Sequence, residues 1–282
     1  MSEKTENEAV ADLADIAAEQ QRTSIATGEV YLVRDGDGGL RVVDTDSYAA
    51  APRHASAARS VSDAASFCAY LHRHGGASTE VYAHTNTSKV VAIIDSHSEL
   101  PGWQKHRVSL DLEKTKAWLA WENADGHLFA QDEFADFLDD RWSDVLEPDA
   151  GVLIDIATTF HAKTNVEFNG GVRLDSGDVK LTFEEKTTAK AGQKGDIEIP
   201  KKIKLGLRPY VGGPVYAIWA HFRYRLRGGQ VLLGFKLERP ENTLEAAFAD
   251  IVTDIREGRT NGDELVHAGI GDIPIFAGKP SA

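Results

Sequence analysis

Residues 214–238 of the chain read PVYAIWAHFRYRLRGGQVLLGFKLE, and this stretch decides the fold. Its two arms, residues 214–227 and 229–238, are rich in aromatic and β-branched residues, which favour strands. The pair Gly228-Gly229 between them is typical of a tight hairpin turn. We therefore expect two long antiparallel strands here.

Further strand-like runs precede this hairpin, and short turns join them. The runs are residues 166–175, 178–187 and 197–207, with turn signals at Asp175-Ser-Gly177 and Gly192-Gln-Lys-Gly195. Parallel neighbours need a crossover of a dozen or more residues, so links this short require antiparallel pairing. The second half of the chain is therefore predicted to form an antiparallel meander.

Elsewhere, strands and helices also occur in separate groups. A glycine-rich turn at residues 35–39 lies within an expected hairpin at residues 28–44, and three more strands are predicted at residues 80–84, 89–95 and 105–112. Helical periodicity predicts helices at residues 8–22, 62–74, 131–146, 150–164 and 243–257. Because strands follow strands, we predict the α+β class, mainly antiparallel sheets with flanking helices.

The tripeptide Glu147-Pro148-Asp149 interrupts this pattern and marks the expected domain boundary. The expected parts are a helical extension over residues 1–27, an α+β subdomain over 28–148, a β meander with flanking helices over 149–268 and a Gly/Pro-rich tail over 269–282. Whether the two halves share one core stays open.

The composition is that of a folded soluble protein. Apolar residues make up 42% and charged residues 27% of the 282 positions, and no apolar stretch approaches the length of a membrane span. The first eight residues are acidic, unlike a secretory signal peptide. A single cysteine, Cys68, excludes an internal disulfide. We expect a cytosolic protein that does not bind membranes.

Charge is distributed unevenly along the chain. The formal charge is −13, from 31 basic and 44 acidic residues. Residues 196–239 nevertheless hold nine Lys and Arg against three acids, a local +6 that leaves −19 for the rest. Such a segment is typical either of a polyanion-binding face or of a surface that complements acidic parts of the same chain or of another copy.

A set of short motifs, taken in order, resembles a known family. They include Ile94-Asp95-Ser-His97, Pro101-Gly-Trp103-Gln-Lys-His106-Arg107, Trp118-Leu-Ala-Trp121, Phe134-Ala-Asp-Phe137-Leu-Asp-Asp140-Arg141, Phe183-Glu184-Glu185 and Arg223-Tyr224-Arg225. Over residues 28–268 this order is similar to the YfdQ-like proteins of phages and prophages. The resemblance implies a phage-encoded, non-virion accessory protein made in the cytoplasm of the infected bacterial host. It brings no assigned activity and no catalytic residues.

The first candidate site is the polar cluster of Asp95, His97, His106 and Arg107, with Glu99 as a possible fifth member. Asp95 ends an apolar strand, and His97 two residues later points to the same side if the strand continues. Aspartate and histidine together are suited to bind a metal ion or to act as an acid–base pair. The alternative is structural: both histidines bond to loop backbone, Trp103 packs, and Arg107 pairs with Asp95.

The second candidate is the basic strand His221-Phe-Arg223-Tyr-Arg225-Leu-Arg227. With a period of two, His221, Arg223, Arg225 and Arg227 share one face, while Phe222 and Tyr224 lie on the other. A row of cations suits the phosphates of single-stranded nucleic acid. The alternative interpretation is structural: these basic side chains form ion pairs with Glu184, Glu185 and the acidic helix at residues 131–146.

Sharper motifs fail. The acidic turn at Asp35-Gly-Asp37 lacks the glycine and glutamate of a calcium loop, His72 and His74 point apart on a helix, and Cys68 lies among apolar neighbours. The sequence contains no phosphate-binding glycine loop and no nucleophile elbow. We therefore expect no cofactor, no metal and no catalytic residue.

Three functional hypotheses follow, in order of preference. The first is a non-catalytic protein that acts by homo-oligomeric self-assembly. The second is a single-stranded nucleic-acid binder for phage replication or recombination, using the basic strand. The third is a metal-assisted enzyme that uses Asp95, His97 and His106.

Overall fold

The computed structural model describes residue 14 and residues 26–34, 39–162, 167–173, 179–185, 193–227 and 230–280, with only the backbone for residues 159–199 and 226–227. The chain divides into two compact units, residues 1–57 and residues 58–282. The helix predicted at residues 8–22 lies outside the described residues except for Ala14.

The first unit contains the predicted hairpin. Strands β1 (Val30–Arg34) and β2 (Leu40–Asp44) pair antiparallel, with Leu32 opposite Val42. A short 3-10 helix, η1 (Asp46–Tyr48), follows. The buried Thr45 hydroxyl donates to the carbonyl of Glu29 at 2.7 Å and so ties the chain on both sides of the hairpin together.

The strands of the predicted meander are antiparallel but are divided between two sheets. Its last strands belong to a five-stranded antiparallel sheet of the second unit, here called the β13 sheet. Its order is β7 (Leu128–Ala130), β14 (Gln230–Leu237), β13 (Tyr216–Arg227), β12 (Lys202–Leu207) and β8 (Val145–Glu147). The last residue of β13 faces the first of β14, as the Gly-Gly turn predicts.

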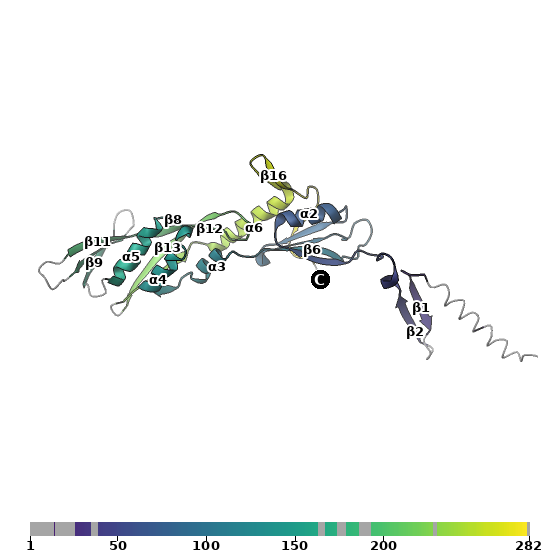
Figure 1. The fold of residues 1–282 in the computed structure, drawn as a ribbon, viewed down its shortest axis with the longest axis horizontal. Coiled ribbons are helices and arrows are strands. Elements are labelled where there is room, and N and C mark those ends of the chain that lie inside the picture. The colour runs from purple at the N-terminus through teal and green to yellow at the C-terminus, as the bar shows by residue number, and fades with distance from the viewer. Residues whose placement is uncertain are drawn as a thin grey trace, which may run out of the picture. The chain divides into compact units, whose positions relative to one another are not determined.

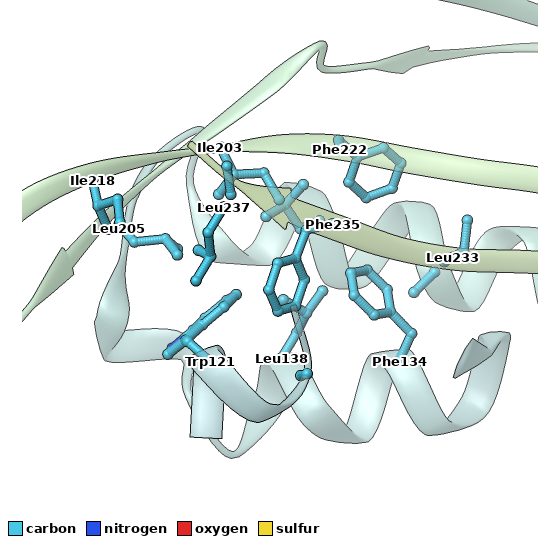
Figure 2. Packing of buried hydrophobic residues seen from close by; sticks show 14 of the residues in the cluster. Trp121, Phe134, Leu138, Ile203, Leu205, Ile218, Phe222, Leu233, Phe235 and Leu237 are labelled. Atoms are coloured by element: carbon cyan, nitrogen blue, oxygen red, sulfur yellow. The ribbon is translucent and has the colours of Figure 1, made fainter. Parts of the chain in front are cut away.

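One face of the β13 sheet is covered by helices α3 (Lys116–Asn123), α4 (Gln131–Asp139) and α5 (Ala150–Ala162) (Figure 1). Figure 2 shows Trp121, Phe134 and Leu138 of α3 and α4 packed against Phe222 and Phe235 of the strands. Alternate residues of each strand enter this core, so the residues between them lie on the other, open face.

A second five-stranded sheet, here called the β5 sheet, has its own core. Its order is β17 (Ile275–Ala277), β4 (Glu80–His84), β5 (Lys89–Ile93), β6 (His106–Asp111) and β3 (Ala57–Val61). Strands β4, β5 and β6 are antiparallel, whereas β17 joins β4 in parallel. Helices α2 (Ala64–His74) and α6 (Pro240–Glu257) pack on one face, where Phe67 and Phe248 are buried.

Smaller elements complete the described residues. Strands β9 (Glu167–Arg173), β10 (Val179–Glu185) and β11 (Gln193–Ile199) form an antiparallel sheet in the order β11-β10-β9. Strands β15 (Gly258–Asn261) and β16 (Glu264–Ala268) form a hairpin after α6, and η2 (Thr85–Thr87) links β4 to β5.

The α+β class and the mainly antiparallel sheets are confirmed. Two predicted elements differ in detail. The run at residues 197–207 is two strands, β11 and β12, separated at Pro200, which lacks the N–H that a sheet ladder needs. The helix predicted at residues 131–146 ends at Asp139 and is followed by η3 (Trp142–Asp144) and β8, because Val145 pairs with β12.

Both cores of the second unit combine residues from both sides of position 148. The core under the β13 sheet joins Trp118 to Phe235, and the core under the β5 sheet joins Phe67 to Ile255. The domain division at residues 148–149 stays a prediction.

Candidate functional site

The first predicted site is a loop that Asp95 closes. The loop connects β5 to β6, and the Asp95 carboxylate accepts hydrogen bonds from the backbone N–H groups of His106 at 2.8 Å and Lys105 at 3.0 Å. The Asp95 carbonyl also accepts from the backbone of Gln104 at 3.1 Å. These bonds satisfy the turn's backbone and hold its two ends together.

The loop leaves no room for a side chain at Gly102. A Cβ there would lie 2.1 Å from the carbonyl oxygen of Asp95 and 2.3 Å from that of Ser96. Both neighbours are backbone atoms that cannot move aside without opening the loop. Glycine at this position is therefore a requirement of the fold.

The two histidines of this cluster point to different partners. The exposed ring of His97 bonds to the backbone N–H of Gly102 at 3.1 Å and to the side-chain amide of Gln104 at 2.7 Å. His106 is buried, and its Nε2 lies 2.8 Å from the hydroxyl of Tyr70. The cluster therefore brings Asp95 to the backbone of His106 and not to its ring.

Arg107 has a different partner from the one that the structural alternative gave it. Its Nε donates to the carbonyl of Gln104 at 2.7 Å, while Asp95 is occupied by backbone N–H groups. Glu99 is exposed at the tip of the same loop. Within the described part of the chain, no three His, Cys, Asp or Glu side chains are grouped so as to hold a metal ion.

The second predicted site lies on the open face of the β13 sheet. Phe222 is buried beneath the helices, so His221, Arg223 and Arg225 project to the opposite side, where both arginines are exposed. Arg227 ends β13 opposite Gln230, and its side chain lies outside the described residues.

Trp219 is the member of this face that sequence analysis missed. It lies two residues before His221 on the same strand and is 39% exposed. The predicted basic strand begins at His221, and within it the aromatic residues lie only on the other face. The signal was present in the same period-two pattern, extended by one step.

Acidic residues neutralise one end of this face. Lys202 donates to Glu238 at 2.8 Å, and Nε2 of His221 lies 3.6 Å from the same carboxylate. The hydrogen bond from Lys202 lowers the pKa of Glu238. Lys204 donates to Glu147 at 3.0 Å, and the ammonium groups of both lysines lie over the Trp219 ring, 5.9 and 5.5 Å from its centre.

Arg223 and Arg225 remain at the other end without such compensation. No carboxylate with a described side chain forms an ion pair with either guanidinium. The acidic helix α4 packs on the opposite face of the sheet through Phe134. The side chains of the other predicted partners, Glu184 and Glu185, lie outside the described residues.

A third surface, on the β1–β2 hairpin, was not predicted as a site. Directly opposed residues share a face in an antiparallel pair. Val30, Leu32, Leu40 and Val42 therefore lie on one face of this hairpin, and they are 50%, 70%, 69% and 64% exposed. We call these four residues the aliphatic hairpin face.

Comparison with known proteins places this architecture in a family. The family model described as uncharacterized conserved protein (DUF2303) matches residues 3–273. The chain belongs to the DUF2303 family. No curated protein and no solved structure matches it.

This DUF2303 chain exposes two surfaces whose charged or apolar groups have no partner among the described residues. The Asp95 loop uses its polar groups to close itself, whereas the open face of the β13 sheet and the aliphatic hairpin face present unsatisfied charge and apolar area. None of the helices in the described part of the chain combines the length and the apolar character that a transmembrane helix needs.

Proposed function

We propose that this DUF2303 protein is a phage-encoded accessory protein of the host cytoplasm that acts by assembling into a homo-oligomer and has no catalytic activity. Its resemblance to YfdQ-like proteins supports the phage origin and the accessory role. The aliphatic hairpin face is the observation that carries self-assembly.

A hairpin of this size gains little stability from its own two strands. A two-stranded hairpin is marginal in water, and here each strand has five residues. Complete burial of a valine or leucine side chain contributes ~1.5–3 kcal/mol. Four such side chains, each at least half exposed, therefore leave a substantial stabilisation unused until another surface covers them.

A second copy of the same hairpin is a suitable partner. Arg34 lies at the Leu40 end of the face and Asp44 at the Val30 end, with the aliphatic residues between them. A two-fold axis through the centre places each arginine opposite the aspartate of the other copy and buries the aliphatic residues together. Asp44 also accepts from Arg53 of its own chain, yet 55% of its side chain remains exposed.

Light scattering coupled to size-exclusion chromatography tests this proposal. We expect the wild-type protein to elute above the 30.7 kDa of one chain at low and high salt. The double variant Leu32→Thr/Val42→Thr, which keeps β-forming residues but makes the face polar, should elute as a monomer. The control Val33→Thr, on the other face of the hairpin, should assemble like wild type. A wild-type monomer in both salts refutes self-assembly.

Trp219 favours a second candidate function, the binding of single-stranded nucleic acid. Stacking platforms combine aromatic rings with cations that contact phosphates, and the open face of the β13 sheet presents Trp219 together with Arg223 and Arg225. Arg223→Glu/Arg225→Glu should abolish a mobility shift with oligonucleotides at low salt. The matched control Arg73→Glu/Arg256→Glu makes the same charge change on α2 and α6 and should leave the shift intact. A wild-type protein that shifts no oligonucleotide excludes this function.

A further inference from the structure

The open face of the β5 sheet contains a hollow of roughly 470 Å³. Its lining includes Arg59, Tyr82, His84, Val91, Arg107 and Lys279. These residues come from four strands and from the segment after β17, all within the second unit. Ligand sites for small molecules and single nucleotide units typically have volumes of ~300–1,000 Å³.

The floor of the hollow is aromatic and apolar. Tyr82 faces Val91 across the β4–β5 pair, and both side chains are half-buried. Phe276 of β17 does not line the hollow but lies beside Tyr82, with ring centres 5.5 Å apart and a tilt of 37°, and is 44% exposed. The Tyr82 hydroxyl donates to Glu80 at 3.0 Å, which fixes the orientation of the ring. The face therefore presents a pre-positioned aromatic pair.

The rim of the hollow is positively charged. Arg59 and Lys279 are exposed, and within the described part of the chain neither forms an ion pair. Arg107 uses its Nε to donate to the carbonyl of Gln104, which orients the guanidinium group and leaves its two terminal nitrogens for another acceptor.

The acidic groups of this face are already occupied. Asp111 accepts from Lys89 at 2.8 Å and from Ser60 and Ser109, and these contacts, above all the bond from Lys89, lower its pKa. Glu80 accepts from Tyr82 and Ser96. Arg59, Arg107 and Lys279 therefore surround an aromatic floor with no carboxylate partner among the described residues, although the chain carries a net charge of −13.

We propose that this hollow binds a nucleotide unit of single-stranded nucleic acid. The base stacks on Tyr82 and Phe276, and Arg59, Arg107 and Lys279 contact the phosphates on either side. Any base can stack on an aromatic ring, and a guanidinium group can donate two parallel hydrogen bonds to a phosphate. The site therefore binds a single strand without sequence preference. This inference goes beyond self-assembly, does not depend on it, and uses a different sheet from the Trp219 face.

Fluorescence anisotropy with a labelled oligothymidine of about 15 nucleotides tests the site, because single-strand binding domains span ~4–16 nucleotides. Arg59→Glu/Lys279→Glu should weaken binding at least ~10-fold and lower the slope of log K against log salt by about 1.4, since each single-strand phosphate contact contributes ~0.7. Tyr82→Ala/Phe276→Ala should weaken binding at least ~5-fold at every salt concentration, because stacking contributes ~1–3 kcal/mol per base.

Two controls separate this site from its alternatives. Arg73→Glu/Arg256→Glu, with the same charge change, should bind like wild type, and equal weakening in this control refutes the site. If Arg223→Glu/Arg225→Glu abolishes binding while Arg59→Glu/Lys279→Glu does not, the β13 sheet is the binding face and this proposal fails.

The remaining outcomes are equally decisive. Unlabelled thymidine monophosphate should displace the labelled oligonucleotide only at concentrations far above those at which unlabelled oligonucleotide does so, which supports recognition of a strand. If the two competitors are equally potent, the hollow is a site for free nucleotides and the proposal is contradicted. No wild-type anisotropy change refutes it. A change of oligomeric state in Arg59→Glu/Lys279→Glu, with unchanged anisotropy, assigns the face to a second copy of the chain and also refutes it.

Discussion

Replacing Asp95 by alanine tests whether the first polar cluster is a structural loop or a reaction centre. The Asp95 carboxylate accepts two backbone hydrogen bonds, at 2.8 and 3.0 Å. A hydrogen bond to a charged group contributes ~1.5–3 kcal/mol, and the side chain is only half-buried, so the lower end of that range applies to each bond. We therefore expect Asp95→Ala to lower the free energy of unfolding by about 3 kcal/mol.

Urea unfolding followed by far-ultraviolet circular dichroism measures this loss. Asp95→Asn retains one acceptor and should lose roughly half as much, and His97→Ala, at an exposed ring, should change the free energy of unfolding by less than ~0.5 kcal/mol. If Asp95 had a catalytic role and no structural one, Asp95→Ala would leave the free energy of unfolding unchanged. If Asp95→Ala unfolds within ~0.5 kcal/mol of wild type, the loop-closure argument is wrong.

Four further predictions follow from the described contacts. Gly102→Ala should destabilise the protein by more than ~2 kcal/mol, as measured by urea unfolding, because its Cβ collides with two backbone carbonyls; a neutral effect contradicts that geometry. Phe235→Ala should lose ~3–5 kcal/mol in the same assay, because Phe235 is fully buried, whereas Tyr224→Ala, at a partly exposed ring, should lose clearly less. Burial raises the pKa of the Cys68 thiol to about 11, so iodoacetamide at about pH 8 should modify it only after unfolding; rapid labelling of the native protein argues against burial. The bond from Lys89 lowers the pKa of Asp111, so the stabilisation of the fold by this pair is complete above pH ~4 and is lost as the pH falls through the lowered pKa. Asp111→Asn should therefore make the melting temperature depend less on pH in that range. If the variant shows the same dependence of melting temperature on pH as wild type, the pair does not stabilise the fold.

Local patterns predicted the elements whose partners are close in sequence. The hairpin of β13 and β14 follows from its glycine turn and strand composition, and α2 follows from the Asp63 cap, whose carboxylate accepts from the backbone of Ser66 at 2.7 Å. Helix α4 was predicted too long because Val145 pairs with β12, about 60 residues later, and such pairing outweighs helical periodicity. Strand β17 was missed because three residues carry no readable period.

The contacts within the first candidate cluster could not be predicted from the sequence. Asp95, His106 and Arg107 lie in one region, and the structural alternative paired Asp95 with Arg107. The returning loop instead places backbone N–H groups within 3.0 Å of the carboxylate. The conformation of the loop determines which group contacts the Asp95 carboxylate, and here Gly102 and the left-handed backbone of Gln104 set that conformation. The spacing of residues along the chain does not predict this contact.

The outermost strands of the β13 sheet, β7 and β8, have only three residues each, while β13 has twelve. Such short border strands present few unpaired backbone N–H and C=O groups, and this disfavours pairing with a strand of a neighbouring molecule. A further strand therefore finds little room to extend this sheet at either border, and the sheet meets its surroundings mainly through the side chains of its open face.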